Sequence, residues 1–373
     1  MGAGSTSASV AAVEDEAGVG IVGCGFVATE HHVEAIATAG SRVAAVYDSD
    51  RDAAVRLVQR ADGAAVGDSL DEMLGRRDLG AVAVCTPPGL HREGAIAALD
   101  RGHDVIVEKP VAVSLEAATE IIEARERSGR RAAVGFNLRA HAVLSGCRDA
   151  IRAGAIGDPV MLTHSWVGPA HLATGNWVED PTRGGSLTME RGSHCIDAAR
   201  FLTGGEVVAV AATEVAAEAV SLSLELEAPG GGDVLAAVTM GVGPVAVNRL
   251  RCTGTAGTIE CDLYAFDGLR TYVPGALPGS VGERVKGVLA SPAKLPGLAR
   301  AARGNGIFRD SYARQWAYFL DPAGPESGDL ASLEDGRAAL AAVLAALAAQ
   351  AEGRTIAVAD GPRDLAAVGA TTG

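Results

Sequence analysis

The amino-acid sequence predicts an α/β chain in which a doubly wound domain precedes an α+β domain with a large open, mostly antiparallel sheet. Two patterns predict this. From Gly18 onward, short apolar runs alternate with helix-like segments, which is typical of a parallel sheet with helices on both faces. After about Asn137 the alternation ends and strand-like runs follow one another, which favours antiparallel pairing. At 373 residues, the chain is long enough for both domains.

The first domain is assigned to residues 18–138. We expect its strands at 18–22, 43–47, 81–85, 104–107 and 132–135, and its helices at 27–39, from Asp50, at 93–101 and at 114–127. These strands are continuous apolar runs, as strands buried on both faces should be. Residues 1–17 are small and polar and lack the basic start and apolar core of a signal peptide, so we expect a disordered tail there.

The second domain is assigned to residues 139–358, and a tail is expected at 359–373. We expect helices at 141–153 and 193–202, and strands at 160–167, 207–215, 220–227, 234–242 and 245–252. Residues 221–227 alternate between polar and apolar, so one sheet face should be solvated or covered, either by a second copy in a homodimer or homotetramer or by helices. The apolar helix 333–351 should pack between layers.

Composition limits the possible partners and compartments. The net charge of −14 argues against nucleic acid or an anionic membrane as a partner, and no apolar run approaches membrane-spanning length. Six scattered cysteines without a CxxC pair fit free thiols in a reducing cytoplasm, and no His/Asp/Glu spacing suggests a metal. The Ala, Gly, Val and Arg content is typical of a bacterial genome of high GC content. Basic residues within 284–303 fit either an anion-contacting loop or a solvated insertion.

A glycine-rich turn follows the first predicted strand. In Gly23-Cys-Gly25-Phe-Val-Ala28, Gly23 permits a tight turn and Gly25 allows the backbone to approach a pyrophosphate. Ala28 is small enough for the following helix to pack on the sheet. With Phe26 and Val27 between them, these residues predict a dinucleotide-binding turn of the Rossmann type at a helix N-terminus.

Asp48 indicates which dinucleotide is bound. It ends the second predicted strand, 23 residues after Gly25. A carboxylate at this place accepts hydrogen bonds from a ribose 2′-hydroxyl and repels a 2′-phosphate. The sequence therefore predicts NAD rather than NADP, although Asp48 taken alone would also fit a turn at a strand end.

Lys109 stands out because lysine is rare in this chain. Three of the 32 basic residues are lysines, and the other two, Lys286 and Lys294, lie far downstream. Arginine does not release its proton, whereas a lysine amine can be tuned to donate and accept one. A lysine at this position therefore indicates chemistry that charge alone does not provide. A simple ion pair with the neighbouring Glu108 is the alternative.

Four motifs in order carry a resemblance to a known family. They are Gly23-Cys-Gly25-Phe-Val-Ala28, Cys85-Thr-Pro-Pro-Gly-Leu-His91, Val107-Glu-Lys-Pro110 and Gly184-Gly-Ser-Leu-Thr-Met-Glu-Arg-Gly-Ser-His194. The chain resembles the glucose–fructose oxidoreductase, inositol dehydrogenase and rhizopine-catabolism (Gfo/Idh/MocA) family, well over 18–204 and loosely over 310–358. The resemblance implies an NAD(P) domain, an open-sheet domain, and hydride transfer at a secondary alcohol of a sugar, cyclitol or related polyol bound between them.

The resemblance assigns catalytic roles to three residues. Lys109 matches the family's active-site lysine and His194 its catalytic histidine, while Glu190 stands where the family commonly has aspartate. Alcohol oxidation needs a base for the hydroxyl proton, and histidine has a suitable pKa. Lys109 would stabilise the developing alkoxide, and Glu190 is expected to orient the His194 ring. A histidine that caps its own helix is the alternative for His194.

Further residues are expected beside the cofactor and the substrate. The resemblance places four beside the cofactor: Thr86, Pro87, His91 and Glu108. Polar groups and aromatic faces suit sugar hydroxyls and C–H faces. On this ground the weaker candidates are Asn137 at the cofactor, and Arg139, His164, Trp166 and Trp177 at the substrate. For each tryptophan, core packing is an equally good interpretation.

The sequence thus predicts an NAD-dependent oxidoreductase, a cytoplasmic homo-oligomer acting on a sugar or cyclitol with or without a linked nucleotide. Two alternatives stay open. A redox-neutral enzyme would use transient oxidation by tightly held NAD for elimination, glycoside cleavage or epimerisation. A catalytically inactive NAD-binding regulator is the second, and the intact Lys109 and His194 speak against it.

Overall fold

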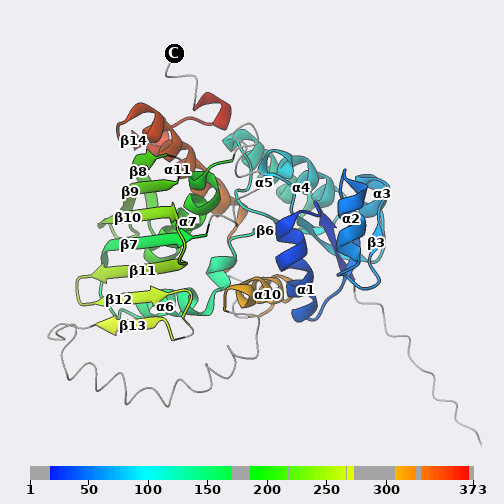
Figure 1. Cartoon of the computed structure of the whole chain (residues 1–373), viewed down its shortest axis with the longest axis horizontal. Helices are drawn as coiled ribbons and strands as arrows, with labels where there is room; N and C mark the ends of the chain where they lie inside the picture. The colour runs from blue at the N-terminus through cyan, green and yellow to red at the C-terminus, as the bar shows by residue number, and fades with distance from the viewer. Residues whose placement is uncertain are drawn as a thin grey trace, which may run out of the picture.

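The computed structural model describes residues 17–169, 185–216, 218–265, 267–272, 307–324 and 329–368. Two sheets lie side by side, each packed with helices (Figure 1). The predicted fold class, a Rossmann domain followed by an α+β domain with an open sheet, is confirmed. Trp177 and the basic segment 284–303 lie outside the described residues.

The first sheet has six parallel strands in the order β3-β2-β1-β4-β5-β6, which is the order of a Rossmann domain. The strands are β1 (Gly18–Val22), β2 (Val43–Tyr47), β3 (Ala65–Val66), β4 (Leu79–Val84), β5 (Asp104–Val107) and β6 (Ala132–Val134). The helices between them are a π-helical turn η1 (Ala28–His32) with α1 (Val33–Thr38), then α2 (Arg51–Val58), α3 (Leu70–Leu74), α4 (His91–Asp100) and α5 (Leu115–Ser128). The chain direction reverses around β1 and β4, where ligands of such sheets bind.

The second sheet has eight strands in the order β13-β12-β11-β7-β10-β9-β8-β14. They are β7 (Pro159–Gly168), β8 (Glu206–Val215), β9 (Ala219–Glu227), β10 (Asp233–Val242), β11 (Val247–Gly254), β12 (Thr258–Asp262), β13 (Leu269–Tyr272) and β14 (Ile356–Ala357). Every pair is antiparallel except β7 with β10.

One face of this second sheet is buried and the other is exposed. Residues of β9 alternate between exposed and buried along the whole strand. The buried face packs on α6 (Ala142–Arg152), α7 (Ser193–Thr203) and α11 (Leu333–Glu352). The alternation expected for 221–227 is therefore confirmed.

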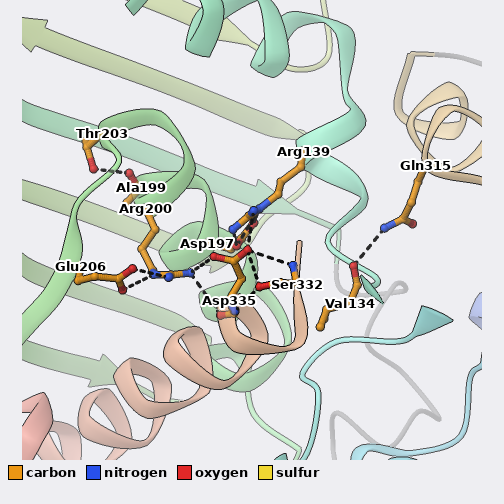
Figure 2. Close-up of polar contacts among 10 residues, drawn as sticks. All are labelled: Val134, Arg139, Asp197, Ala199, Arg200, Thr203, Glu206, Gln315, Ser332 and Asp335. Carbon is orange, nitrogen blue, oxygen red and sulfur yellow. Dashed lines mark hydrogen bonds and ion pairs between the residues drawn. The ribbon is translucent and has the colours of Figure 1, made fainter. Parts of the chain in front are cut away.

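Two late helices join the domains (Figure 1). The helix α11 packs on α5 and β6 of the first domain and on α7 and β8 of the second, as expected for a helix between layers. The helix α10 (Ile307–Leu320) packs on η1, α1 and the short turn η3 (Asn137–Ala140). Within α10, Gln315 donates a hydrogen bond to the carbonyl oxygen of Val134 at 3.3 Å (Figure 2). The second half of the chain therefore reaches back onto the dinucleotide domain.

Some elements were not predicted from the sequence: α3, α10, β3, β12, β13 and β14. β3 and β14 have two residues each, and β13 is a mostly exposed edge strand, so their patterns are too short or too polar to read. The described part of the expected tail, residues 359–368, contacts the first domain, because Leu365 N–H donates to the carbonyl oxygen of Val113 at 3.0 Å. This bond attaches residue 365 to the segment just before α5.

Candidate active site

The glycine turn after β1 is shaped for a bound diphosphate. Gly23 has φ +90°, and a Cβ atom there would lie 2.6 Å from the amide nitrogen of Thr86, so no side chain fits. A Cβ atom on Gly25 would meet nothing within 4 Å, which leaves that backbone open to approach. Phe26 is 54 % exposed and Val27 half-buried at the start of the following helix. The first amides of a helix lack intrahelical partners, so this turn fits the pyrophosphate of a dinucleotide.

Asp48 is held at the end of β2 beside that turn. Its Oδ2 accepts a hydrogen bond from the Cys24 N–H at 2.7 Å, and its Oδ1 accepts one from the Asp50 N–H at 2.8 Å. A carboxylate offers about four acceptor positions, so these two bonds leave capacity for ribose hydroxyls. The half-buried carboxylate is therefore oriented in advance for the role predicted from the sequence.

His91 connects the two loops at the carboxyl ends of β4 and β5. Its ring nitrogens lie 2.7 Å from the carbonyl oxygen of Thr86 and 2.9 Å from that of Pro110. Burial lowers the pKa of His91. His91 is fully buried and holds these two loops together, whereas Thr86 and Pro87 are half-buried.

Glu108 follows β5 and is 5 % exposed. Its Oε1 lies 2.9 Å from His32 Nε2, and its Oε2 accepts a hydrogen bond from the Lys109 main-chain N–H at 3.1 Å. Burial alone would raise the pKa of Glu108, but the hydrogen bond from His32 and the charge of Lys109 bring it below its ordinary value. Glu108 is therefore an ionised, buried carboxylate next to the candidate catalytic lysine.

Lys109 reaches from the end of β5 to the turn before α7. Its Nζ donates to the main-chain oxygen of Glu190 at 3.0 Å and lies 3.8 Å from the Glu190 carboxylate. The other carboxylate oxygen of Glu190 lies 3.4 Å from Arg191 Nε. With 9 % of its side chain exposed, Lys109 is a nearly buried cation held at the junction of the two domains.

His194 is the second residue of α7, which follows the π-helical turn η7 (Thr188–Gly192), and it is 4 % exposed. The centroid of its ring lies 5.7 Å from that of Phe136 and 5.5 Å from that of Trp166. Burial and the nearby positive charge of Lys109 hold the pKa of His194 well below its usual range, so the imidazole is neutral at neutral pH. Among the described residues, its Nδ1 has no hydrogen-bond partner.

The expected contact between Glu190 and His194 is not formed within the described residues. The Glu190 carboxylate lies against Lys109 and Arg191, and His194 Nδ1 is left without a partner. The structure thus brings Lys109, Glu190 and His194 together, but the carboxylate contacts the lysine rather than the histidine.

His164 and Trp166 lie on β7 beside His194. Their rings are stacked, with the ring centroids 6.2 Å apart. His164 Nε2 lies 2.8 Å from Asn248 Oδ1 on β11. That oxygen only accepts, so His164 carries its hydrogen on Nε2. In the part of the chain that is described, His164 Nδ1 and Asn248 Nδ2 are buried without partners. Burial lowers the pKa of His164 to about 4.

Arg139 occupies a different place from the one expected (Figure 2). Its guanidinium donates to both carboxylate oxygens of Asp197, with the shortest distance at 2.7 Å, and to Asp335 at 3.0 Å. Because these buried ion pairs occupy its donors, we leave Arg139 out of the proposed substrate site. Asn137 is fully buried and donates to Ser311 Oγ at 2.7 Å, so we also leave it out of the cofactor site.

Two tyrosines near the site were missed by sequence reasoning. Burial raises the pKa of Tyr264, while a side-chain contact with Trp166 and the positive charge of Arg191 act in the opposite direction. Burial likewise raises the pKa of Tyr312, with Glu108 and Glu190 acting in the same direction. Both tyrosines lie outside every motif. Their scarcity, five in the chain, was the one available signal.

No metal cluster and no membrane helix is found in the described part of the chain. No three His, Cys, Asp or Glu residues there are grouped to hold a metal ion. No described helix combines the length and apolar character needed to cross a membrane. The six cysteines are free.

The glycine turn, the sheet order and the open-sheet domain define a two-domain protein with an NAD-binding Rossmann fold. Residues 17–136 match the family model described as "Oxidoreductase family, NAD-binding Rossmann fold", and residues 146–260 match "GFO/IDH/MocA C-terminal domain". The chain therefore belongs to the Gfo/Idh/MocA family, as the sequence motifs indicated.

Named relatives share part of the chain. An inositol 2-dehydrogenase of Streptomyces avermitilis is 34 % identical over 197 residues, which are 52 % of this chain and 55 % of the relative. A 1,5-anhydro-D-fructose reductase of Ensifer adhaerens is 34 % identical over 187 residues, covering 49 % of this chain and 55 % of the relative. The chain thus spans little more than half the length of these curated relatives.

A solved structure extends the likeness over nearly the whole fold. The scyllo-inositol dehydrogenase from Lactobacillus casei, with bound NAD(H) and scyllo-inositol, superposes with a TM-score of 0.69. It is 19 % identical, and the match covers 91 % of this chain and 98 % of that one. At this identity the likeness shows the shared fold.

Proposed function

We propose that this chain is an NAD-dependent oxidoreductase that transfers hydride between a secondary alcohol of a sugar, cyclitol or related polyol and nicotinamide. The observation that carries the proposal is the meeting of Lys109, at the carboxyl end of β5, with the turn that leads into His194. A cation and a neutral imidazole then lie close together at the edge of the dinucleotide domain.

The two side chains have complementary tasks. Neutral His194 accepts the proton of the substrate hydroxyl, and the low pKa imposed by burial keeps it ready to do so at neutral pH. Lys109 donates a hydrogen bond to the same oxygen and stabilises its developing negative charge. Bound NAD⁺ supplies the hydride acceptor, held by Gly23, Gly25 and Asp48.

Glu190 acts on Lys109 in this proposal. Its main-chain oxygen and carboxylate both face the ammonium group, at 3.0 and 3.8 Å, and so fix where Lys109 points. The sequence-based expectation gave the same carboxylate to His194. A substrate-induced shift of the ring toward Glu190 would reconcile the two roles, and kinetics of the variants described below separate them.

The substrate pocket is proposed around Trp166, His164 and Tyr264. The indole offers an apolar face for sugar C–H groups, while the unpartnered polar atoms of His164 and Asn248 suit hydroxyls. Inositol 2-dehydrogenase and 1,5-anhydro-D-fructose reductase are among the relatives, which supports a polyol rather than another alcohol. Trp177, from outside the described residues, remains a candidate on sequence grounds.

We also propose that the protein is a cytoplasmic homodimer or homotetramer that binds neither nucleic acid nor membrane. Met161 and Leu235 are opposite residues of β7 and β10 and are 42 % and 48 % exposed. Such apolar residues on an open sheet face suit a second copy of the chain. Light scattering after gel filtration tests this, and a Leu235→Lys variant that stays oligomeric to the same extent argues against this face.

A substrate panel tests the proposed activity. Purified protein with NAD is given sugars, cyclitols, aminocyclitols and nucleotide sugars, and both thermal shift and NADH absorbance are recorded. NADH formation with at least one polyol is expected. A polyol that is consumed without NADH release favours the redox-neutral alternative, and binding of NAD without turnover of any polyol favours a regulator.

A further inference from the structure

Three buried side chains from distant parts of the sequence form a hydrogen-bonded series that ends at Lys109. Trp316 Nε1 lies 3.0 Å from His32 Nδ1. His32 Nε2 lies 2.9 Å from Glu108 Oε1, and Glu108 Oε2 accepts from the Lys109 main-chain N–H at 3.1 Å. Trp316 and His32 are completely buried, so water does not compete for these bonds.

The chemistry of the three groups fixes the direction of every hydrogen bond. An indole N–H only donates, so His32 Nδ1 must accept. The neutral ring then carries its hydrogen on Nε2, and this hydrogen points at Glu108. Glu108 is ionised and only accepts, first from His32 and then from the backbone of Lys109.

We propose that Trp316, His32 and Glu108 are positioning residues that fix the backbone of Lys109 for the alcohol oxidation described above. The proposal rests on that proposed function. Trp316 belongs to α10, His32 to the turn η1 after the dinucleotide glycines, and Glu108 to the end of β5. A helix from the second half of the chain thus controls the lysine of the first domain.

The surroundings of the series support this role. A Cβ atom on Gly135 would lie 2.7 Å from Glu108 Oε1, so a glycine at this position leaves room for the carboxylate. The ring centroids of Tyr312 and Trp316 lie 5.7 and 5.9 Å from that of His32, both in T-shaped contacts, and this packing helps to fix the imidazole. Glu108 fixes the backbone of Lys109, while Glu190 holds its ammonium group at the other end of the side chain.

Loss of the indole N–H has a defined consequence. Without it, His32 Nδ1 is a buried acceptor without a donor, which is unfavourable. The ring can then turn away from its present orientation, which weakens the Nε2–H bond to Glu108 and loosens the carboxylate that holds the Lys109 N–H. The expected effect falls on turnover more than on cofactor binding, because the glycine turn is untouched.

The test compares Trp316→Phe with a packing control on the same helix, Phe319→Leu. Phe319 is 2 % exposed and contacts the Trp316 ring edge. We expect Trp316→Phe to lower kcat about tenfold, because a factor of about ten corresponds to the loss of one buried hydrogen bond. KM for NAD should change less than about twofold. Phe319→Leu should lower the melting temperature and leave kcat within about twofold of wild type.

Two further measurements keep the test decisive. Nitrogen-15 spectra of histidine-labelled, cofactor-free protein should show His32 protonated on Nε2, and the Nδ1 resonance should shift in Trp316→Phe because its hydrogen-bond donor is lost. His32→Gln, which keeps an N–H donor, should retain at least about a third of the wild-type kcat, whereas His32→Leu should lose about tenfold or more.

The outcomes separate this proposal from the proposed function. Wild-type kcat in Trp316→Phe, an equal loss in Phe319→Leu, or His32 protonated on Nδ1 in the wild type each overturns the positioning role while leaving the oxidoreductase intact. If no polyol is turned over by the wild type, the proposed function fails. The tautomer of His32 then still decides whether the hydrogen-bonded series exists.

Discussion

Two buried polar clusters in this protein differ in how completely their atoms are paired. The ion-pair cluster consists of Arg139, Asp197, Arg200 and Asp335 (Figure 2). Its guanidinium and carboxylate groups all meet opposite charges, at distances of 2.7 to 3.2 Å, and Asp335 also caps α11 together with Ser332. These ion pairs join the second-domain helix α7 to η3 and α11.

The site cluster consists of His194, His164 and Asn248. Within the described residues, Nδ1 of each histidine and Nδ2 of the asparagine are buried without a partner. A buried polar atom without a partner costs about 1 to 3 kcal/mol, so native proteins keep few of them. The contrast teaches that pairing separates these two clusters. The first is paired within the protein and joins elements of the fold, whereas the second keeps polar atoms available for the polyol of the proposed function.

The largest expected effect breaks the saturated cluster. Asp197→Asn removes the charge opposite Arg139 and should lower the free energy of unfolding by about 3 to 5 kcal/mol, measured in urea. Because we leave this cluster out of the proposed substrate site, KM for the polyol should stay within about twofold of wild type. Glu206→Gln is the control, since this exposed partner of Arg200 should cost less than about 1 kcal/mol. A large rise in KM in Asp197→Asn would place the cluster in the substrate site after all.

The next effect sharpens the role of Glu190. Glu190→Gln should lower kcat about 100-fold while changing NAD affinity little, because the lost charge faces Lys109. Residues that act as a unit are non-additive. In the double variant with Lys109→Met, Glu190→Gln should therefore lower kcat little further. In the double variant with His194→Ala, it should lower kcat by its full single-variant factor. The reverse pattern would show that the carboxylate orients the histidine, and Glu190→Asp should retain part of the activity in both cases.

A third test uses pH on a histidine away from the site. Burial lowers the pKa of His141 to about 4 from an ordinary value of 6.5. The folded state therefore favours neutral His141. The free energy of unfolding keeps the full contribution of this preference above pH 6.5, and it loses that contribution as the pH falls from 6.5 toward 4. His141→Asn keeps an acceptor for the start of α6 and should reduce the loss of stability between pH 7 and pH 5 by about 2 kcal/mol. Identical pH dependence in both proteins would mean that His141 titrates normally.

The smallest effect concerns the cofactor. In the proposed cofactor site Asp48 faces the adenosine ribose, so NAD should bind at least about tenfold more tightly than NADP, or by about 1.4 kcal/mol. Calorimetric titration with both dinucleotides measures this. Asp48 also holds the Cys24 N–H, so Asp48→Asn keeps an acceptor for the turn and serves as the matched variant in which the preference should shrink. Equal affinities in the wild type would remove Asp48 from this role.

Much of the fold was readable from the sequence because it rests on local patterns. The strands of the first domain are continuous apolar runs, and β9 alternates with period two, so periodicity alone places them. The glycine turn and Lys109 were also visible, since glycine and a rare lysine carry chemical meaning at a single position. The pairing of these residues across the two domains followed from the family resemblance.

The remaining features depend on tertiary contacts that no local pattern records. In the sequence, nothing distinguishes Arg139 from a substrate-binding arginine. Its partners Asp197 and Asp335 lie far along the chain, and only the fold brings them beside it. Helix α10 carries Trp316 to His32 across 284 residues of sequence, and polar residues on its buried side weaken the apolar stripe that would reveal it. Glu190 was predicted as a site residue, but its partner among the site residues was not.

The most direct measurement of the central claim is the turnover of Lys109→Arg with the best polyol of the panel. Arginine keeps the positive charge but changes the donor geometry and removes proton-transfer capacity. We predict that kcat falls at least about 100-fold while NAD affinity and melting temperature stay near wild type. A Lys109→Arg enzyme with wild-type kcat would contradict the account, because Lys109 would then be an ordinary ion-pair residue.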